Sequence, residues 1–308
     1  MSSHSYQFSA TLMDEIWQAD ENRLTPVKIK PQGPIGGEYI CVVCGMDRKR
    51  SNPNFTLFKL YQYDATKHVY VQVKNSEFLQ SNSKQAKNYK LISRLFDNYS
   101  LDQHSREVNT EEERKEVEQF LESIVQTKCM RILGQKYMKL STPTELKVKL
   151  REIWFKQYNL HNYKDLSGFE HLVVGEKNGD KVSGYHYWFK YLLDDSTDNH
   201  TGQDVISFAG RLDNESTPDY VCVRFKQDED VDGDGQSDNQ LFKSCGSFFV
   251  GISPECLLAL STLAYLESLQ PSGKKNLSDV KINGNRYVIN VFNEGGYPRS
   301  IYPSLIGQ

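Results

Sequence analysis

Two histidines, His171 and His186, lie fifteen residues apart in similar surroundings. Each follows a turn of small residues and leads into a hydrophobic run, and the run 171–174 is typical of a strand. The segment 175–184 is rich in turn-forming residues, which predicts a hairpin that brings both imidazoles to one cleft. The alternative is that each is a structural histidine, because histidine is often partly buried.

A pair of imidazoles suits one reaction of RNA in particular. One ring takes the proton of a 2′-hydroxyl while the other gives a proton to the departing 5′-oxygen, and imidazole titrates near neutral pH, where both forms are accessible. A cation beside the rings would stabilise the charge that grows on the phosphorane oxygens. Lys243, in the segment 242–247, is the candidate for this cation. The alternative is a solvated surface lysine.

The elements that must position these residues begin with a β-containing unit. Residues 1–88 contain a loop rich in proline and glycine and three β-like runs, at 39–43, 56–61 and 69–73. Turn-forming residues separate the runs, so we expect a small accessory unit here. Residues 89–308 are expected to form the larger domain.

Residues 89–162 predict helices. Thr110, with Glu113 three residues later, forms a capping box, and the Thr-Pro-x-Glu segment 142–145 forms a second. Apolar residues at helical spacing follow both starts. We therefore expect a helical layer that packs on another element.

Residues 163–308 alternate strand-like runs with turns. The runs are 171–174, 220–225, 247–250 and 286–292. One helix interrupts them, with Ser253 as its cap and a proline at its first position. The fold class that follows is α+β: an N-terminal β-containing unit, a helical layer and an antiparallel β-rich catalytic region.

The composition is that of a folded globular protein, with 38% hydrophobic and 12% aromatic residues in a chain of 308. No run approaches the ~18 consecutive apolar residues of a membrane span, and the first residues lack the pattern of a secretory signal, so a cytoplasmic location is expected. Six cysteines do not make a disulfide scaffold.

The net charge of −3 hides an uneven distribution. The segment 194–238 holds thirteen acidic and three basic residues, which leaves a net charge of +7 on the remainder. A basic groove on this body would attract phosphate groups, although an ordinary mixed surface has the same composition.

Several short motifs occur in order along residues 89–308. In the β-rich part they are Gly168-Phe169-Glu170-His171, Val174-Gly175-Glu176, Gly184-Tyr185-His186, Lys243-x-x-Gly246-Ser247, Gly251-x-Ser253-Pro254-Glu255 and Ser300-Ile301-Tyr302-Pro303. In the helical part they are 95–99, 120–124 and 153–155. Together they resemble the EndoU family, the uridylate-specific endoribonucleases of animals, bacteria and nidoviruses.

The resemblance implies a catalytic role for three residues. His186 would be the general base for the 2′-hydroxyl, His171 the general acid for the leaving 5′-oxygen, and Lys243 would stabilise the transition state. The implied products are a 2′,3′-cyclic phosphate and a 5′-hydroxyl end. No cofactor is required for this chemistry, although Mn²⁺ or Ca²⁺ could stimulate it.

The implied partner is single-stranded RNA, which proteins usually read by stacking on, and hydrogen bonds to, an unpaired base. Gly184 would offer its backbone N–H to the phosphate. Ser247 and Ser300 would contact the uracil or its ribose, and Tyr302 would pack on the sugar or base. The residues alone leave alternatives: Tyr302 as ordinary core and Ser300 as a turn residue. No membrane partner is expected, and a protein inhibitor is left open.

An acidic run just before Lys243 resembles the start of a calcium loop. Asp230, Asp232, Asp234 and Asp238 stand at ligand positions 1, 3, 5 and 9, with a glycine at position 6. Position 12 is a leucine rather than the bidentate glutamate that such a loop uses. The run predicts a calcium site that would order Lys243; the alternative is a solvated acidic loop.

A second metal motif is incomplete. Cys41 and Cys44 have the spacing of half a zinc site, but no second pair follows. We therefore interpret them as structural thiols in a strand.

Two other functions remain open. One is a non-catalytic RNA-binding or interaction module with an EndoU-like fold, although mere binding needs no proton donor. The other is a metal-dependent hydrolase that uses both histidines and a carboxylate, Glu170 or Glu176. Product ends distinguish the latter, because a metal-activated water leaves no cyclic phosphate.

Overall fold

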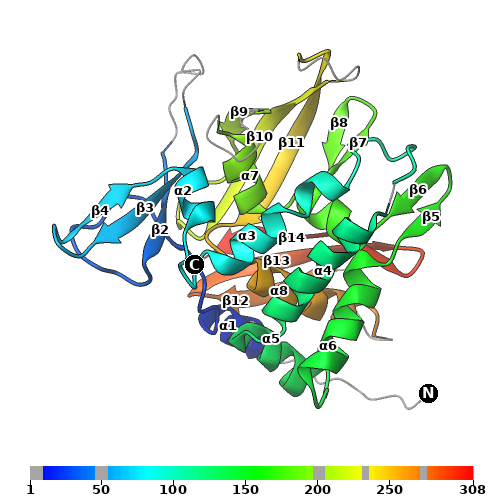
Figure 1. Ribbon diagram of the computed structural model, residues 1–308, viewed down its shortest axis with the longest axis horizontal. Helices are drawn as coiled ribbons and strands as arrows, with labels where there is room; N and C mark the ends of the chain where they lie inside the picture. Colours follow the sequence, from blue (N-terminus) through cyan, green and yellow to red (C-terminus); the bar gives the residue numbers. More distant parts are fainter. Residues whose placement is uncertain are drawn as a thin grey trace.

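The structure is a computed structural model that describes residues 10–45, 55–107, 109–196, 205–230, 236–270 and 276–307. Within these ranges, helices cover four sheets whose strands are mostly antiparallel (Figure 1). The α+β class that the sequence predicts is confirmed.

The N-terminal part consists of one helix and a four-stranded sheet. Its elements are α1 (Ala10–Gln18), β1 (Thr25–Val27), β2 (Tyr39–Val43), β3 (Phe58–Asp64) and β4 (Val69–Gln72). The sheet lies at the left of Figure 1, whereas the helix packs below β12 (Asn276–Ile282) and beside α5 (Lys128–Ile132). β1 runs parallel to β2, and the other neighbours are antiparallel. The three predicted strands are therefore present, each within a few residues of its expected bounds.

The helical layer follows. Its elements are α2 (Asn75–Gln80), α3 (Lys87–Ser93), the 3₁₀ turn η1 (Phe96–Asn98), α4 (Glu111–Ile124), α5 (Lys128–Ile132), the π-helical turn η2 (Leu133–Tyr137), α6 (Pro143–Leu150) and the π-helical turn η3 (Arg151–Phe155). Both predicted capping boxes are confirmed, because the hydroxyls of Thr110 and Thr142 accept hydrogen bonds from the backbone N–H groups of Glu113 and Glu145 at 3.1 and 3.2 Å.

The β-rich part contains three further sheets. A two-stranded sheet holds β5 (Tyr158–Leu160) and β6 (Tyr163–Leu166). A five-stranded sheet has the order β7 (Glu176–Asn178), β8 (Lys181–Ser183), β11 (Asn239–Phe249), β10 (Tyr220–Glu229) and β9 (Ile206–Arg211). A three-stranded antiparallel sheet holds β12 (Asn276–Ile282), β13 (Asn285–Glu294) and β14 (Tyr297–Gly307).

Helix α8 (Pro254–Ser268) lies at the centre of the packing, between the helical layer and β13 (Figure 1). The hydroxyl of Ser253 caps it, as predicted, by accepting from the N–H of Cys256 at 3.2 Å. The indole of Trp154 donates to Thr262 on α8, and that of Trp188 donates to Ile252, each at 2.8 Å. Truncating a buried tryptophan typically costs about 3–5 kcal/mol. These contacts therefore hold the elements on both sides of the site to α8.

The main hydrophobic core extends across the boundary predicted at residue 88. It includes Trp17 and Leu60 on one side and Trp154 and Ile301 on the other. The division of the chain at this residue stays a prediction. Among the described helices, none is long and apolar enough to cross a membrane.

Candidate active site

The segment that carries His171 is a π-helical turn, η4 (Glu170–Val174). The strand predicted at 171–174 is therefore wrong. Ser167 starts the turn, because its hydroxyl accepts from the N–H of Glu170 at 3.1 Å, and the Glu170 carboxylate accepts from the N–H of Ser167 at 3.2 Å. Four buried apolar or aromatic positions in a row do not distinguish a short buried helix from a buried strand, which explains the error.

The predicted hairpin is wrong in its arms, because the runs at His171 and His186 are not strands and the hairpin lies within the connection 175–184. This hairpin still brings the two histidines together. β7 and β8 form its arms, with His171 just before it and His186 just after it. The N–H of Tyr185 donates to the carbonyl of His171 at 3.0 Å, and the N–H of His186 donates to the carbonyl of Leu172 at 2.7 Å. Because these bonds join the two backbones directly, the separation of the imidazoles is set by main-chain geometry.

Gly184 makes this approach possible. Its φ is +66°, in the left-handed region, and a Cβ at this position would lie 1.9 Å from the carbonyl oxygen of His171. No side chain fits there without moving one of the two histidine segments.

His171 is held by a network of charged and polar side chains. Its Nδ1 lies 2.8 Å from Glu176 Oε2, and its Nε2 lies 2.8 Å from the hydroxyl of Ser300 on β14. Arg299 donates to both oxygens of Glu176, at 3.0 and 2.6 Å, and the amide of Gln103 donates to the same carboxylate. Burial lowers the pKa of His171, while the Glu176 carboxylate opposes this shift.

Arg299 and Gln103 were not among the site residues predicted from the sequence. Arg299 lies directly before the recognised Ser-x-Tyr-Pro motif, and an arginine beside a motif serine is the signal that was available. Nothing near Gln103 in the sequence indicates its contact, because the contact spans 73 residues.

His186 is held by packing. Its ring stacks on Tyr302 of β14, with centroids 4.6 Å apart and planes 20° from parallel. Its Nδ1 is buried and has no hydrogen-bond partner among the residues that the structure describes. Burial holds the pKa of His186 well below its usual value, and Lys243 and His171 lower it further.

Lys243 and Ser247 reach the two histidine segments from β11. Lys243 is 7% exposed, and its ammonium donates to the carbonyl of Gly184, so it lies at the junction between the histidines. Burial lowers the pKa of Lys243 to about 8. Ser247 is 2% exposed, and its hydroxyl has no partner in the described ranges.

The last strand, β14, brings Ser300 and Tyr302 to the same place. Phe292 on β13 adds a third ring beyond Tyr302, with centroids 6.1 Å apart and planes 11° from parallel. Phe292 is 52% exposed, which is unusual for phenylalanine. The available signal was alternation: residues 287, 289 and 291 face the core, so Phe292 had to face outward.

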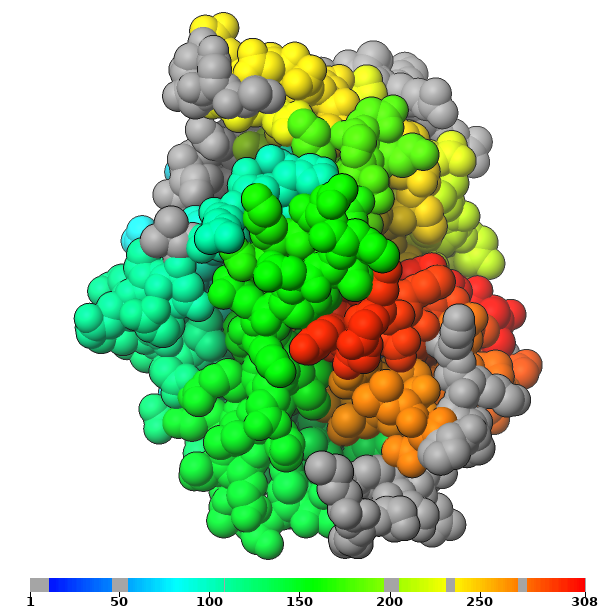
Figure 2. Space-filling model, turned by 90° about the vertical axis from the view of Figure 1, so that its right-hand side faces the viewer, coloured from blue at the N-terminus to red at the C-terminus, as the bar shows by residue number. Residues whose placement is uncertain are grey.

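Figure 2 shows the C-terminal strands lying against the segment that carries β5 and β6. There Tyr158 and Tyr297 stack with centroids 4.1 Å apart. Arg299 also reaches the hydroxyl of Tyr158, at 3.3 Å. The strand that carries Ser300 and Tyr302 is therefore fixed from both sides.

Half of the predicted calcium run, Asp232 and Asp234, lies outside the described residues. Asp230 directly follows β10, and Asp238 directly precedes β11. Among described residues, no three His, Cys, Asp or Glu side chains are grouped as a metal site requires. Cys41 is buried in β2 and Cys44 is partly buried beyond it, as expected for structural thiols.

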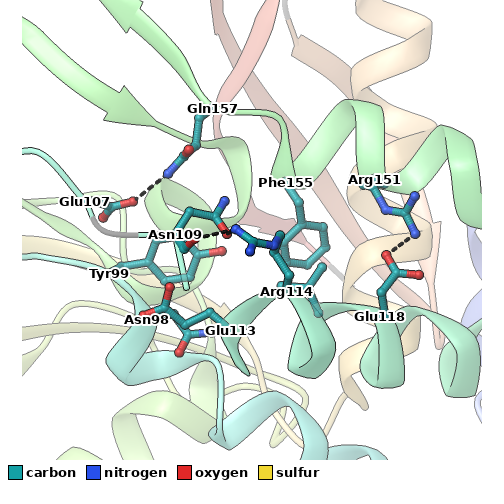
Figure 3. A pocket seen from close by; sticks show the side chains of 11 residues that line it. Asn98, Tyr99, Glu107, Asn109, Glu113, Arg114, Glu118, Arg151, Phe155 and Gln157 are labelled. Carbon is teal, nitrogen blue, oxygen red and sulfur yellow. Dashed lines mark hydrogen bonds and ion pairs between the residues drawn. The ribbon is translucent and has the colours of Figure 1, made fainter. Parts of the chain in front are cut away.

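A separate hollow of about 350 Å³ lies behind η4 (Figure 3). Tyr99 and Phe155 line it and contact Phe169, two residues before His171, with centroids 5.7 and 4.7 Å away. Glu107, at one end of the hollow, accepts from Gln157, and burial raises the pKa of Glu107 to about 7. The hollow is therefore separated from His171 by Phe169, and neither histidine lines it.

Two imidazoles, an ammonium and an aromatic surface in one cleft define an acid–base site that suits a phosphodiester flanked by bases. The family model described as Endoribonuclease XendoU matches residues 8–303. The chain therefore belongs to the XendoU family of endoribonucleases, and the resemblance found in the motifs is confirmed.

Individual relatives agree with this. The chain is 31% identical to Poly(U)-specific endoribonuclease-A of Xenopus laevis over 307 residues, covering 96% of this chain and 92% of the relative. It is 28% identical to Uridylate-specific endoribonuclease B of Danio rerio over 296 residues, covering 90% and 91%. A solved structure, described as XendoU, a splicing independent snoRNA processing endoribonuclease, matches 98% of both chains with a TM-score of 0.68 and 26% identity.

Proposed function

We propose that this endoribonuclease cleaves single-stranded RNA at uridine and leaves a 2′,3′-cyclic phosphate and a 5′-hydroxyl. The observation that carries the proposal is the joining of His171 and His186 by backbone hydrogen bonds, with the Lys243 ammonium bound at the glycine between them. The uridine preference is supported by the printed names of the relatives, which are poly(U)-specific or uridylate-specific.

His186 is the general base and His171 the general acid in this proposal. Burial lowers the pKa of both rings, but only at His171 does a carboxylate, that of Glu176, oppose the shift, which favours His171 as the ring that carries the proton. Environments that push two pKa values apart in this way favour one acid and one base.

The reaction is a single transesterification. His186 accepts the proton of the 2′-hydroxyl, the 2′-oxygen forms a bond to phosphorus, and the bond from phosphorus to the 5′-oxygen breaks. His171 delivers its proton to that oxygen. Lys243 and the N–H of Gly184 stabilise the charge on the non-bridging oxygens, where preorganised donors act most strongly.

The base is bound beside Tyr302. The unpartnered hydroxyl of Ser247 is available for a hydrogen bond to the uracil, and Ser300 contacts the ribose side next to His171. Phe292 extends the aromatic surface outward, and an exposed ring next to a base site suits a neighbouring base. This combination binds an unpaired strand better than a duplex, whose bases are already stacked.

The test uses an RNA of about ten residues with one uridine, incubated in EDTA and then with Mn²⁺ or Ca²⁺. A cyclic phosphate at the uridine, identified by mass, is the expected product, and it is lost in His171→Ala and His186→Ala. The metal series tests the proposed stimulation. Binding of RNA without cleavage under every condition would overturn the proposal and favour the interaction module.

A further inference from the structure

Cys222 on β10 and Cys245 on β11 face each other across the two strands. Their sulfur atoms lie 2.8 Å apart, and Cys245 is exposed. The pairing of the strands is irregular here: Val223 pairs with Gly246 and Phe225 with Lys243, so β11 carries one extra residue between Gly246 and Lys243. Such bulges re-aim a side chain, and Cys245 lies within this one.

The cysteine pair lies at the edge of the cleft. Cys245 is two residues beyond Lys243 and two before Ser247, and Cys222 pairs with Ser247 in the strand register. Both thiols raise the pKa of Lys243 electrostatically, and both also raise that of Tyr302. A change of charge at these sulfurs is therefore felt by two residues of the proposed site.

Cys245 differs from the other cysteines in its chemistry. The hydrogen bond from Cys222, helped by Lys243 and Arg224 and opposed by burial, lowers the pKa of the Cys245 thiol to about 7. Burial raises the pKa of Cys41, Cys44, Cys129 and Cys256. The thiolate is the nucleophile of cysteine, so an exposed sulfur that ionises near neutral pH is the reactive one.

We propose that Cys222 and Cys245 form a reversible redox site that reacts with hydroperoxides. The Cys245 thiolate attacks the terminal oxygen of the peroxide, the O–O bond breaks, and Cys245 becomes a sulfenic acid. The other oxygen takes up a proton and leaves as water from hydrogen peroxide, or as an alcohol from an organic hydroperoxide. The Cys222 sulfur then displaces the hydroxyl of the sulfenic acid, which gives a disulfide and a water. A disulfide bond is about 2.05 Å long, so the sulfurs need to approach by less than 1 Å.

The consequence for activity rests on the proposed function. In the reduced protein the Cys245 thiolate favours the ammonium form of Lys243, which burial disfavours. The disulfide has no charge, so the ammonium form becomes less populated. If the pKa of Lys243 falls from about 8 by about one unit, cleavage at pH 8 falls about fivefold.

The first experiment needs no activity. The folded protein is treated with hydrogen peroxide, and its peptides are mapped by mass without reduction. We expect a Cys222–Cys245 cross-link with the loss of two hydrogen atoms, reversed by dithiothreitol. Cys129 and Cys256 are the matched control, because they also share a hydrogen bond but are 1% and 0% exposed. In Cys222→Ser the sulfenic acid of Cys245 should be trapped by dimedone.

Two results would overturn the redox site: no cross-link in the oxidised native protein, or equal oxidation of the buried control pair. The second experiment compares cleavage by the oxidised and re-reduced protein at pH 8, with Cys245→Ser as the peroxide-insensitive variant. A cross-link that leaves cleavage unchanged would overturn the effect on Lys243. A protein that cleaves no RNA in either form would overturn the proposed function and leave the mass result standing.

Discussion

Around His171 the protein places charges, whereas around His186 it places rings and apolar walls. His171 contacts the Glu176 carboxylate, which Arg299 and Gln103 bind in turn. His186 stacks on Tyr302 and borders a small apolar cavity of about 20 Å³. In the proposed mechanism, the histidine that carries a proton thus has a counter-ion, and the one that starts neutral has a low-dielectric surrounding.

This difference predicts different sensitivities for the two sides. The surroundings of His171 should respond to changes of charge that leave their shape intact. The surroundings of His186 should respond to changes of shape that leave their charge intact. The junction between them, at Gly184, should affect both.

The largest effect is expected for Gly184→Ala. A Cβ there would lie 1.9 Å from the His171 carbonyl, so one histidine segment must move. A displacement of about 1 Å costs about 10²-fold in rate, and with both proton transfers disturbed we expect a loss of about 10³-fold in kcat/KM. Steady-state cleavage of the single-uridine RNA measures it.

Gly179→Ala is the matched control. Gly179 has φ of +64°, almost that of Gly184, but nothing lies within 4 Å of a Cβ built on it. It should lose about 1–2 kcal/mol of stability from the left-handed backbone and keep most of its activity. Equal losses of cleavage in the two variants would show that strain in the left-handed backbone, rather than the contact of the new Cβ with His171, causes the loss.

The next effect tests the charged side. Arg299→Gln removes the cation that holds Glu176, and we expect a loss of about 10²-fold in kcat. Arg299 lowers the pKa of His171, so this pKa should rise in the variant. The alkaline limb of its pH–rate profile should therefore lie at a higher pH than that of the parent enzyme. Arg299→Lys, which keeps the charge, should recover part of the rate.

Arg286→Gln serves as the control for losing an arginine. Arg286 pairs with Asp279 at 2.6 Å, and both side chains are exposed, at 45% and 58%. Its replacement should change neither rate nor pH profile, since surface ion pairs contribute little. A pH profile of Arg299→Gln that matched the parent enzyme would argue that Arg299 only stabilises the fold.

A smaller effect is expected on the packed side. Tyr302→Phe keeps the ring against His186 and should retain most of the activity, whereas Tyr302→Leu removes the ring. Stacking of one base on an aromatic side chain is worth about 1–3 kcal/mol, so KM for the RNA should rise about tenfold in the leucine variant. If phenylalanine were as damaging as leucine, the hydroxyl rather than the ring would be the part that matters.

What the sequence predicts well is local. The helix starts at Thr110, Thr142 and Ser253 were correct, because a cap and its partner lie three residues apart and are read directly. The convergence of His171 and His186 was correct for the same reason, since a short hairpin joins them.

What the sequence did not predict depends on long-range pairing. Gln103 reaches Glu176 across 73 residues, and Arg299 does so across 123. Cys222 and Cys245 meet across 23 residues, beside an irregularity in the pairing of β10 with β11. The turn η4 was mistaken for a strand because its apolar residues are buried by tertiary contacts, which hide the period that would identify it.

The smallest effect concerns the hollow behind the charged side, at Glu107. Its pKa is about 7 in the folded protein and near 4.5 when unfolded, so the folded state binds more protons between these values. Stability is therefore lost as pH rises from about 4.5 through 7. Glu107→Gln keeps the shape of the side chain but does not titrate. Between pH 5 and pH 8 its free energy of unfolding should therefore fall by about 1 kcal/mol less than that of the parent protein, since Glu107 is partly exposed. Urea unfolding at the two pH values measures this, with the exposed Glu122→Gln as the control for losing one negative charge. The same pH dependence in Glu107→Gln and the parent protein would show that Glu107 is solvated like a surface carboxylate.

Unchanged cleavage in Glu107→Gln would place the hollow outside the chemistry, whereas a reduced rate would extend the charged surroundings of His171 through Phe169.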